Sequence, residues 1–230
     1  VNLLKLEPGE TVTAMIPVRE FDDERYLITA TRRGVIKKTR LSAFASLRSS
    51  GIIALTVDEG DELISVRLSD GSQQLFLATR NGLALRCSEG EVRPMGRSAR
   101  GVTGIRLKGE DRVVSMEVVT PGTCILTVTE KGYGKRTEIE EYRVQGRGGK
   151  GIINVKVDQK NGPAITVRQV REDDEILIVT KEGKMLRTQV SDIRAIGRST
   201  MGVKLMDMDA GDHVASVARL EEKRGDQEDV

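Results

Sequence analysis

The sequence is poor in the residues that carry most metal and acid–base chemistry. Its 230 residues include one histidine, His213, two cysteines, Cys87 and Cys124, and no tryptophan. A structural zinc site usually takes four nitrogen or sulfur ligands, so this supply argues against one. Two cysteines cannot build a disulfide framework, which favours a reducing cytoplasm. Aromatic residues make up 3% of the chain, too few for a surface that stacks single-stranded bases.

Long apolar runs are also missing. No run approaches the ~20 residues of a transmembrane helix, and residues 1–20 lack the basic-then-apolar order of a signal peptide, so we expect no membrane partner. Hydrophobic residues make up 38% and charged residues 31% of the chain, with only 5 prolines. This composition is typical of a globular chain, and the length suffices for a hydrophobic core.

The sequence repeats itself about every fifty residues. Four similar segments begin at Tyr26, Leu75, Cys124 and Glu175. Each contains a turn glycine, and these are Gly34, Gly82, Gly132 and Gly183. A second glycine series keeps the same period, at Gly51, Gly101, Gly151 and Gly202. Two independent landmarks with one period indicate a true internal repeat.

Each repeat reads as four short strands. Apolar runs such as Leu75–Ala78 and Ile176–Val179, followed by Thr, polar residues and Gly, predict hairpins buried on both faces. Further strands are predicted after each second-series glycine, for example Ile52–Val57 and Leu63–Leu68. No window shows a sustained helical period. Four-stranded units of this length predict an all-β, propeller-like fold.

We expect one domain over residues 1–220. Its repeat units are 21–70, 71–120, 121–170 and 171–220, and residues 1–20 resemble the second half of a unit. Because that half lacks a partner, we expect the chain to be truncated at its N-terminus. Residues 221–230 carry a net charge of −3 and are predicted to form a disordered acidic tail.

The charges are strongly segregated along the chain. Segments 31–51, 79–101, 129–151 and 180–202 together carry a net charge of +14, and the other residues carry −12. One cation recurs four residues after each turn glycine: Lys38, Arg86, Arg136 and Arg187. Another stands shortly before each second-series glycine: Arg48, Arg97, Arg147 and Arg198. Further candidates in the same segments are Arg32, Arg33, Lys37, Arg100 and Lys135.

Cations at one place in every unit should form a stripe along one rim when the units pack side by side. Such a stripe suits a polyanion, and double-stranded DNA is the natural partner because phosphate neutralisation needs charge and spacing alone. Few Asn, Gln or aromatic residues stand beside these cations, so the predicted binding is sequence-tolerant.

The most distinctive motif is the glycine-rich segment 145–151. It reads Gln145-Gly146-Arg147-Gly148-Gly149-Lys150-Gly151. Its glycines would let backbone N–H groups approach phosphates, with charge from Arg147 and Lys150. No Ser or Thr follows the lysine, so it is not a Walker loop. The structural alternative is an inter-strand loop whose last glycine belongs to the repeat.

The sequence resembles the C-terminal domain family of DNA gyrase A. The resemblance rests on GYGKRT (132–137), MGRSARGVTGIRL (95–107) and IGRSTMGV (196–203), and it covers nearly the whole chain. The family carries a basic box, Q-(K/R)-R-G-G-(K/R)-G, in its first blade. Residues 145–151 match it except for Gly146, which replaces a cation, and they lie in the third full unit rather than the first.

The resemblance implies a β-pinwheel, a propeller-like disc of four-stranded blades whose strands cross between neighbours. The family domain has six blades, so about four to five are expected here. It also implies a non-catalytic, DNA-binding part of an ATP-hydrolysing type II topoisomerase, one that bends and wraps duplex DNA to allow negative supercoiling. The implied partners are the remainder of gyrase A and the gyrase B protein, in the bacterial cytoplasm at the nucleoid. ATP and magnesium would serve the rest of the enzyme, so no cofactor is expected in this chain.

The chain itself is not expected to catalyse a reaction. Its three tyrosines, Tyr26, Tyr133 and Tyr142, lack the acidic, metal-holding setting of a topoisomerase nucleophile and suit packing roles. Two other interpretations stay open. One is the corresponding domain of topoisomerase IV, and the other is a propeller that binds proteins, although no Trp–Asp blade signature is present.

Overall fold

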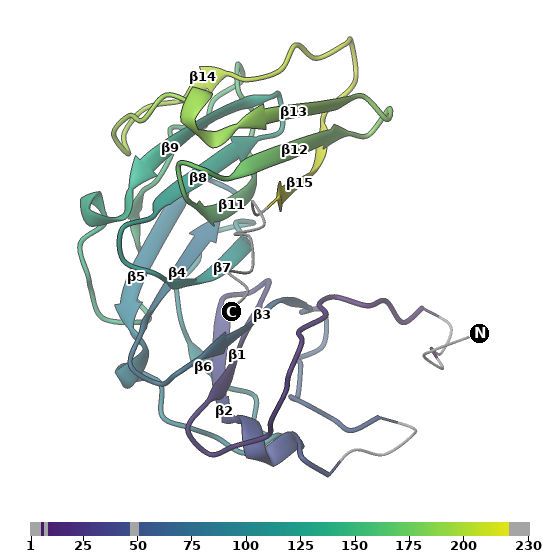
Figure 1. Ribbon diagram of the computed structural model, residues 1–230, viewed down its shortest axis with the longest axis vertical. Coiled ribbons are helices and arrows are strands. Elements are labelled where there is room, and N and C mark those ends of the chain that lie inside the picture. The colour runs from purple at the N-terminus through teal and green to yellow at the C-terminus, as the bar shows by residue number, and fades with distance from the viewer. Residues whose placement is uncertain (1–5, 7–8, 47–50, 221–230) are drawn as a thin grey trace, which may run out of the picture. The chain divides into compact units, whose positions relative to one another are not determined.

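The computed structural model describes residues 6, 9–46 and 51–220 of the chain. These residues form fifteen β-strands and four short 3-10 turns, with no α-helix among them (Figure 1). None of them belongs to a helix that could cross a membrane. The all-β prediction is confirmed.

The described residues fall into two compact units. The first takes in Val1–Thr79, Leu83–Val119 and Arg143–Ile152, and the second Arg80–Gly82, Thr120–Tyr142 and Ile153–Val230. Each unit contains the strands of two of the four predicted hairpins, and the turn Arg80–Gly82 of the second hairpin is grouped with the second unit. A single domain over residues 1–220 stays a prediction.

The first unit is built on two four-stranded sheets, each with a hairpin at its centre. One sheet has the order β3-β1-β2-β6 and the other β10-β5-β4-β7. The strands of the first sheet are β1 (Tyr26–Thr31), β2 (Val35–Arg40), β3 (Leu63–Ser69) and β6 (Val102–Thr103). Those of the second are β4 (Gln74–Thr79), β5 (Leu83–Ser88), β7 (Val113–Val119) and β10 (Ile152–Ile153).

The second unit repeats this plan. One sheet has the order β11-β8-β9-β14, and the other has three strands in the order β13-β12-β15. The strands of the first are β8 (Cys124–Thr129), β9 (Tyr133–Glu138), β11 (Ala164–Val170) and β14 (Val203–Lys204). Those of the second are β12 (Glu175–Thr180), β13 (Met185–Gln189) and β15 (Val214–Leu220).

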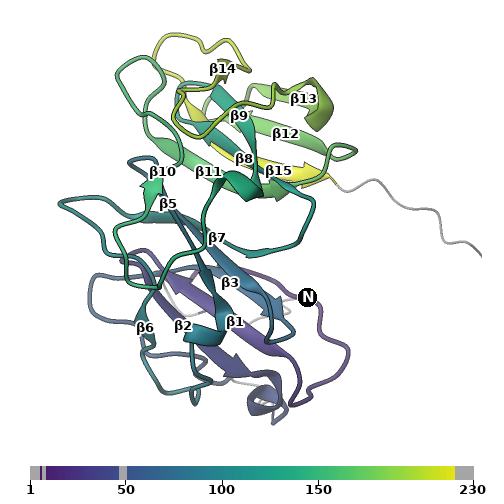
Figure 2. The ribbon, with the colours of Figure 1, turned by 90° about the vertical axis from the view of Figure 1, so that its left-hand side faces the viewer.

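One short strand in each four-stranded sheet comes from the following repeat. Val102 of β6 lies opposite Ile36 of β2, and Val203 of β14 lies opposite Gly134 of β9. β10 stands in the same relation to β5, and Figure 2 shows β6 beside β2 and β10 beside β5. The expectation that strands cross between neighbouring repeats, as in a β-pinwheel, is confirmed.

The turn glycines are required by this exchange. Gly34 and Gly132 have positive φ angles of 84° and 76°, which glycine adopts without steric cost. A Cβ atom on Gly34 would lie 2.8 Å from the backbone oxygen of Ile105, and one on Gly132 would lie 2.7 Å from that of Met206. Each turn therefore packs directly against the backbone of the next repeat.

The second glycine series meets the same constraint from the other side. A Cβ atom on Gly101 would lie 2.5 Å from the backbone oxygen of Ile36. One on Gly202 would lie 2.7 Å from the backbone oxygen of Gly134. The two series keep one period because the same backbone-to-backbone contact recurs.

The threonine that ends the first strand of each hairpin also has a local role. In three hairpins its hydroxyl oxygen accepts a hydrogen bond from the backbone N–H four residues on. These bonds join Val35 to Thr31 (3.2 Å), Leu83 to Thr79 (3.1 Å) and Lys184 to Thr180 (3.1 Å). The hydroxyl thus caps the turn that the glycine makes.

Each unit has its own hydrophobic core, built largely from the hairpin strands. Residues Leu75–Ala78 of β4 are fully buried, as predicted for a strand covered on both faces. In β12, Ile176 and Ile178 are buried but Leu177 and Val179 are partly exposed. The prediction of two covered faces is therefore wrong for Ile176–Val179.

One further strand prediction is corrected. Leu63–Leu68 lies within β3, but Ile52–Val57 forms no strand. The described part of residues 1–20 also contains no strand, so its resemblance to half a unit is not matched by strand structure. A strand requires a hydrogen-bonded neighbour, and a place in the repeat does not by itself supply one. The predicted acidic tail, 221–230, lies outside the described residues.

Gly132→Ala should lower the free energy of unfolding more than Gly183→Ala. Both place a side chain on a positive φ angle, which costs about 1–2 kcal/mol. Only at Gly132 does the new Cβ meet a backbone oxygen, and relieving that overlap should cost about 1–3 kcal/mol more. At Gly183 no atom lies within 4 Å. Urea unfolding of both variants measures the difference, and equal losses would contradict the packing role.

Candidate nucleic-acid interface

Three arginines of the predicted series before the second-series glycines share one structural setting. The Nη1 atom of each donates a hydrogen bond to the backbone oxygen of the residue two positions after the preceding second-series glycine. These pairs are Arg97 to Ile53 (3.2 Å), Arg147 to Thr103 (3.3 Å) and Arg198 to Ile153 (2.8 Å). A guanidinium has five N–H donors, so this bond orients the group and leaves donors for a phosphate. We call residues 95–101, 145–151 and 196–202 the arginine loops.

Two arginine loops are also held by a carboxylate. Oε2 of Glu91 accepts the backbone N–H of Arg147 at 2.9 Å, and Oε2 of Glu141 accepts that of Arg198 at 3.2 Å. Arg147 Nε also donates to the backbone oxygen of Glu91 at 3.0 Å. Sequence reasoning missed these carboxylates, although each stands nine residues after a turn glycine. Ala43 takes that place before the first loop.

The predicted DNA contacts Lys37 and Lys135 are corrected, because the structure buries both side chains. Nζ of Lys37 donates to the backbone oxygens of Ala54 (2.8 Å) and Arg97 (2.5 Å). Nζ of Lys135 donates to those of Gly197 (2.7 Å) and Arg198 (2.6 Å). These ammonium groups lie under the arginine loops and are not available to a phosphate.

Burial is the main influence on the pKa values of Lys37 and Lys135. It lowers the pKa of Lys37 below its usual range, and the positive charge of Arg97 acts in the same direction. Burial lowers the pKa of Lys135 to about 8, opposed by the carboxylate of Glu141 and reinforced by Arg198. Each charge is therefore kept at a cost in solvation.

The cations four residues after the turn glycines pair with groups of the protein. Lys38 is buried, its Nζ lies 2.8 Å from Oε1 of the buried Glu89, and it stands over the ring of Tyr26. Its prediction as a DNA contact is corrected, because the charge is already neutralised in the interior. Glu89 occupies the position that Ile139 and Val190 take in other repeats.

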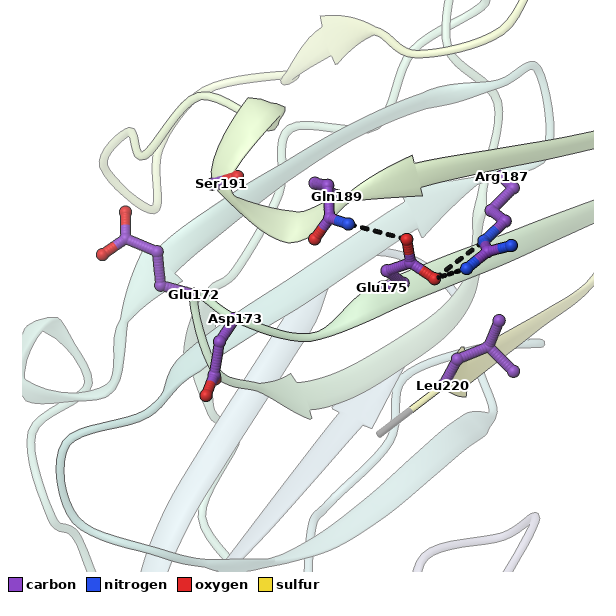
Figure 3. Close-up of a pocket in the computed structure, with 7 residues that line it drawn as sticks. All are labelled: Glu172, Asp173, Glu175, Arg187, Gln189, Ser191 and Leu220. Atoms are coloured by element: carbon purple, nitrogen blue, oxygen red, sulfur yellow. Dashed lines mark hydrogen bonds and ion pairs between the residues drawn. The ribbon is translucent and has the colours of Figure 1, made fainter. Parts of the chain in front are cut away.

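The three arginines of that series remain partly or largely accessible. Arg86 donates to Oε1 of Gln74 at 2.6 Å. Arg136 donates to the backbone oxygen of Ile193 at 2.7 Å and pairs with Glu172 at 3.0 Å. Figure 3 shows Arg187, at the edge of a pocket in the second unit, directed at Glu175, and the amide of Gln189 bonds the same carboxylate.

The remaining predicted cations that the structure describes lie at turns or in loops. Arg32 pairs with Glu62 at 3.2 Å, and Arg33 donates to the backbone oxygen of Glu59 at 3.1 Å. Arg100 pairs with Asp58 at 2.9 Å, yet 70% of its side chain is exposed. Lys150 is exposed, and Arg48 lies outside the described residues.

The glycine-rich loop is held by its own backbone rather than left open. Gln145 N–H donates to Arg86 O (2.9 Å) and Gly148 N–H donates to Gly104 O (2.6 Å). The Gln145 side-chain nitrogen is buried, with no hydrogen-bond partner in the described structure. A Cβ on Gly151 would lie 2.7 Å from the backbone oxygen of Ala84, and Gly149 packs against Leu85. These glycines permit close packing, and the N–H groups of Gln145, Arg147 and Gly148 already donate to oxygens of the protein.

The described tyrosines have packing surroundings. Tyr142 is fully buried, its hydroxyl donates to Oδ1 of Asn154 at 2.6 Å, and burial raises its pKa above the usual range. The ring of Tyr26 receives the ammonium of Lys38. Burial also raises the pKa of the Cys87 thiol to about 12. Among the described residues, no group of three His, Cys, Asp or Glu is placed to hold a metal ion.

The exchanged strands and repeated hairpins define a propeller-type repeat domain. The family model described as "DNA gyrase C-terminal domain, beta-propeller" matches residues 25–70, 73–120, 125–170 and 174–221, one match for each repeat. The chain therefore belongs to the DNA gyrase C-terminal domain family.

Similar proteins agree with this assignment. The DNA gyrase A protein of Haloquadratum walsbyi is 46% identical over 223 residues, covering 94% of this chain and 26% of the relative. That of Salmonella typhimurium is 43% identical over 228 residues, covering 99% of this chain and 26% of the relative. The chain thus spans about a quarter of the length of these relatives.

Two solved structures share the fold. The C-terminal domain of a DNA topoisomerase IV superposes with a TM-score of 0.90 at 29% identity, covering 96% of this chain and 69% of the other. A DNA gyrase A C-terminal domain superposes with a TM-score of 0.79 at 28% identity, covering 88% of this chain and 68% of the other.

The free energy of unfolding of the parent protein should rise with pH when it is compared with that of a Lys135→Leu variant. The unfolded chain holds the Lys135 proton up to about pH 10.5, whereas the folded chain releases it near pH 8. Between these values the unfolded state binds more protons, so the difference should grow by up to about 3 kcal/mol. Denaturant unfolding of both proteins from pH 7 to 10.5 measures it. A difference independent of pH would contradict the assignment.

Proposed function

We propose that this chain is a non-catalytic, duplex-DNA-binding domain, and that the arginine loops are its contact surface. The observation that carries the proposal is the shared setting of Arg97, Arg147 and Arg198. A guanidinium already oriented by one backbone oxygen loses less conformational freedom when it binds a phosphate. The same arrangement in three repeats suits a ligand with a repeating charge, such as a nucleic acid backbone.

The binding is expected to tolerate any duplex sequence. The proposed contacts are cations and backbone groups, which position a protein on DNA without reading its bases. Supporting contacts are proposed for further cations of the same segments: Arg32, Arg33, Arg48, Arg100 and Lys150. Arg86, Arg136 and Arg187 are also proposed as contacts; like Arg32 and Arg100, each also bonds a side-chain oxygen of the protein.

Within a longer protein, the domain would serve a DNA gyrase A. The relatives with that name and the family support this assignment. The domain would bend and wrap duplex DNA to allow ATP-dependent negative supercoiling, together with the rest of gyrase A and with the gyrase B protein. ATP and magnesium would act in those other parts, in the bacterial cytoplasm at the nucleoid.

A topoisomerase IV protein is the second candidate, favoured by the superposition at a TM-score of 0.90. The curated gyrase relatives have higher identities, up to 46% against 29% for that structure. A full-length protein carrying this domain, reconstituted with its partner protein, distinguishes the two. Negative supercoiling of relaxed plasmid supports gyrase, and decatenation without supercoiling supports topoisomerase IV.

The triple variant Arg97→Ala, Arg147→Ala, Arg198→Ala should bind duplex DNA more weakly than the parent. Each lost phosphate contact reduces the magnitude of the negative slope of log K against log salt by about 0.9. The magnitude should therefore fall by nearly 3. Fluorescence anisotropy with a mixed-sequence duplex at several salt concentrations measures both quantities.

The matched control removes three exposed cations outside the basic segments, as Lys108→Ala, Lys160→Ala and Arg171→Ala. This control changes the net charge by the same amount. It should therefore reproduce only the loss of affinity that comes from lower overall charge. If the two triple variants bind alike, the arginine loops are not the contact surface. A parent that binds a protein but no duplex would support the protein-binding propeller instead.

A further inference from the structure

Resting on this proposed function, we propose that Lys37 and Lys135 are positioning residues that hold two arginine loops in their binding conformation. Neither is a DNA contact, because both side chains are buried. Each ammonium spans about sixty residues of sequence to reach the backbone oxygen of the loop arginine itself. Lys37 bonds the oxygen of Arg97, and Lys135 bonds that of Arg198.

The place that these lysines occupy does not require a charge. Both stand three residues after a turn glycine, where the other repeats have Leu85 and Leu186. Leu85 is fully buried, so an apolar side chain fits this position. A buried ammonium is costly unless its donors are satisfied. Both acceptors of Lys135 are oxygens of its arginine loop. Lys37 donates to one loop oxygen, that of Arg97, and to the oxygen of Ala54. Each lysine is thereby tied to its loop.

The hydrogen bonds from the lysines hold the backbone at the loop arginines, and the backbone sets the direction of each arginine side chain. At Lys135 the oxygens of Gly197 and Arg198 are both fixed, and these define the peptide planes on either side of the Arg198 Cα. Glu141 fixes the N–H of the same residue. With its backbone bound from two directions, Arg198 has few orientations available, and its bond to Ile153 completes the arrangement.

The third arginine loop is held differently. Beneath residues 145–151 lies Leu85, which packs against Gly149 where a Cβ atom would stand 3.3 Å from its Cδ1. This loop relies on glycine packing and on Glu91. The chain therefore has two loops fixed by a buried ammonium and one fixed by close packing. Only the first two should respond to loss of a lysine.

A double-mutant cycle between Lys135 and Arg198 tests the proposal. The variants are Lys135→Leu, Arg198→Ala and the two combined, each compared with the parent in duplex binding at fixed salt. In the parent, Arg198→Ala should weaken binding about tenfold, the size of one charge-assisted contact. In the Lys135→Leu background, Arg198→Ala should weaken duplex binding about threefold or less, because Arg198 is no longer held in place.

Two controls separate positioning from charge. Lys131→Leu removes a cation from the exposed turn of the same hairpin, and its effect should add to that of Arg198→Ala. The effect of Lys135→Leu should also add to that of Arg147→Ala, since the Lys135 ammonium bonds a different loop, at Gly197 and Arg198. Additive losses for Lys135 with Arg198 would overturn the proposal. If Lys135→Leu does not fold, the same cycle between Lys37 and Arg97 decides.

A measurement without DNA keeps the two proposals separable. Backbone ¹⁵N relaxation of residues 196–201 should show increased picosecond–nanosecond mobility in the Lys135→Leu variant. The Lys131→Leu variant should show the same mobility as the parent. Unchanged mobility would overturn the positioning role. If Arg198→Ala leaves duplex binding of the parent unchanged, the proposed contact surface fails, while the relaxation data still decide what Lys135 does.

Discussion

The architecture depends on one contact, in which the short strand of one repeat approaches the hairpin of the repeat before it at backbone distance. The pairs Gly34 with Ile105 and Gly101 with Ile36 leave no space for a side chain on either glycine. The hydrogen bonds that pair β6 with β2 and β14 with β9 form only because both backbones come this close. Each four-stranded sheet is thereby completed by the repeat that follows, and the residues just before the short strand lie at a fixed place on the neighbouring hairpin.

The arginine loops are a product of that contact. Each loop leads directly into a short exchanged strand, so its arginine lies within reach of a backbone oxygen from the preceding repeat. The fixed backbone brings carboxylates close as well, since Glu91 and Glu141 bond the N–H groups of loop arginines. The positive charge of the basic segments is thus partly balanced where it is held most firmly. The carboxylates bond the backbone N–H groups, so the guanidinium donors stay available.

The sequence predicted the repeat, the hairpins and the basic segments, because glycine spacing and local charge are properties of short stretches. It did not reveal which lysines point inward. Lys37 and Leu186 occupy equivalent positions, and what admits a charge at Lys37 is a pair of backbone oxygens, one of them sixty residues away. The burial of Lys38 likewise depends on Glu89 from another hairpin. Ile52–Val57 was predicted as a strand because it follows a second-series glycine, yet it forms none in the described structure. Contacts between repeats decided each of these cases, and a single repeat does not contain them.

Recurrence of the same two glycines at each junction has a consequence for how such a chain can change in length. Removal of residues 71–120 would leave Gly151 at the spacing from Gly34 that Gly101 now has, so the first hairpin would meet an equivalent short strand. A deletion of half that length would instead place a residue with a Cβ atom against the turn, where only glycine fits. Duplication or deletion should therefore be tolerated in whole periods, and the number of arginine loops would rise or fall by one at a time.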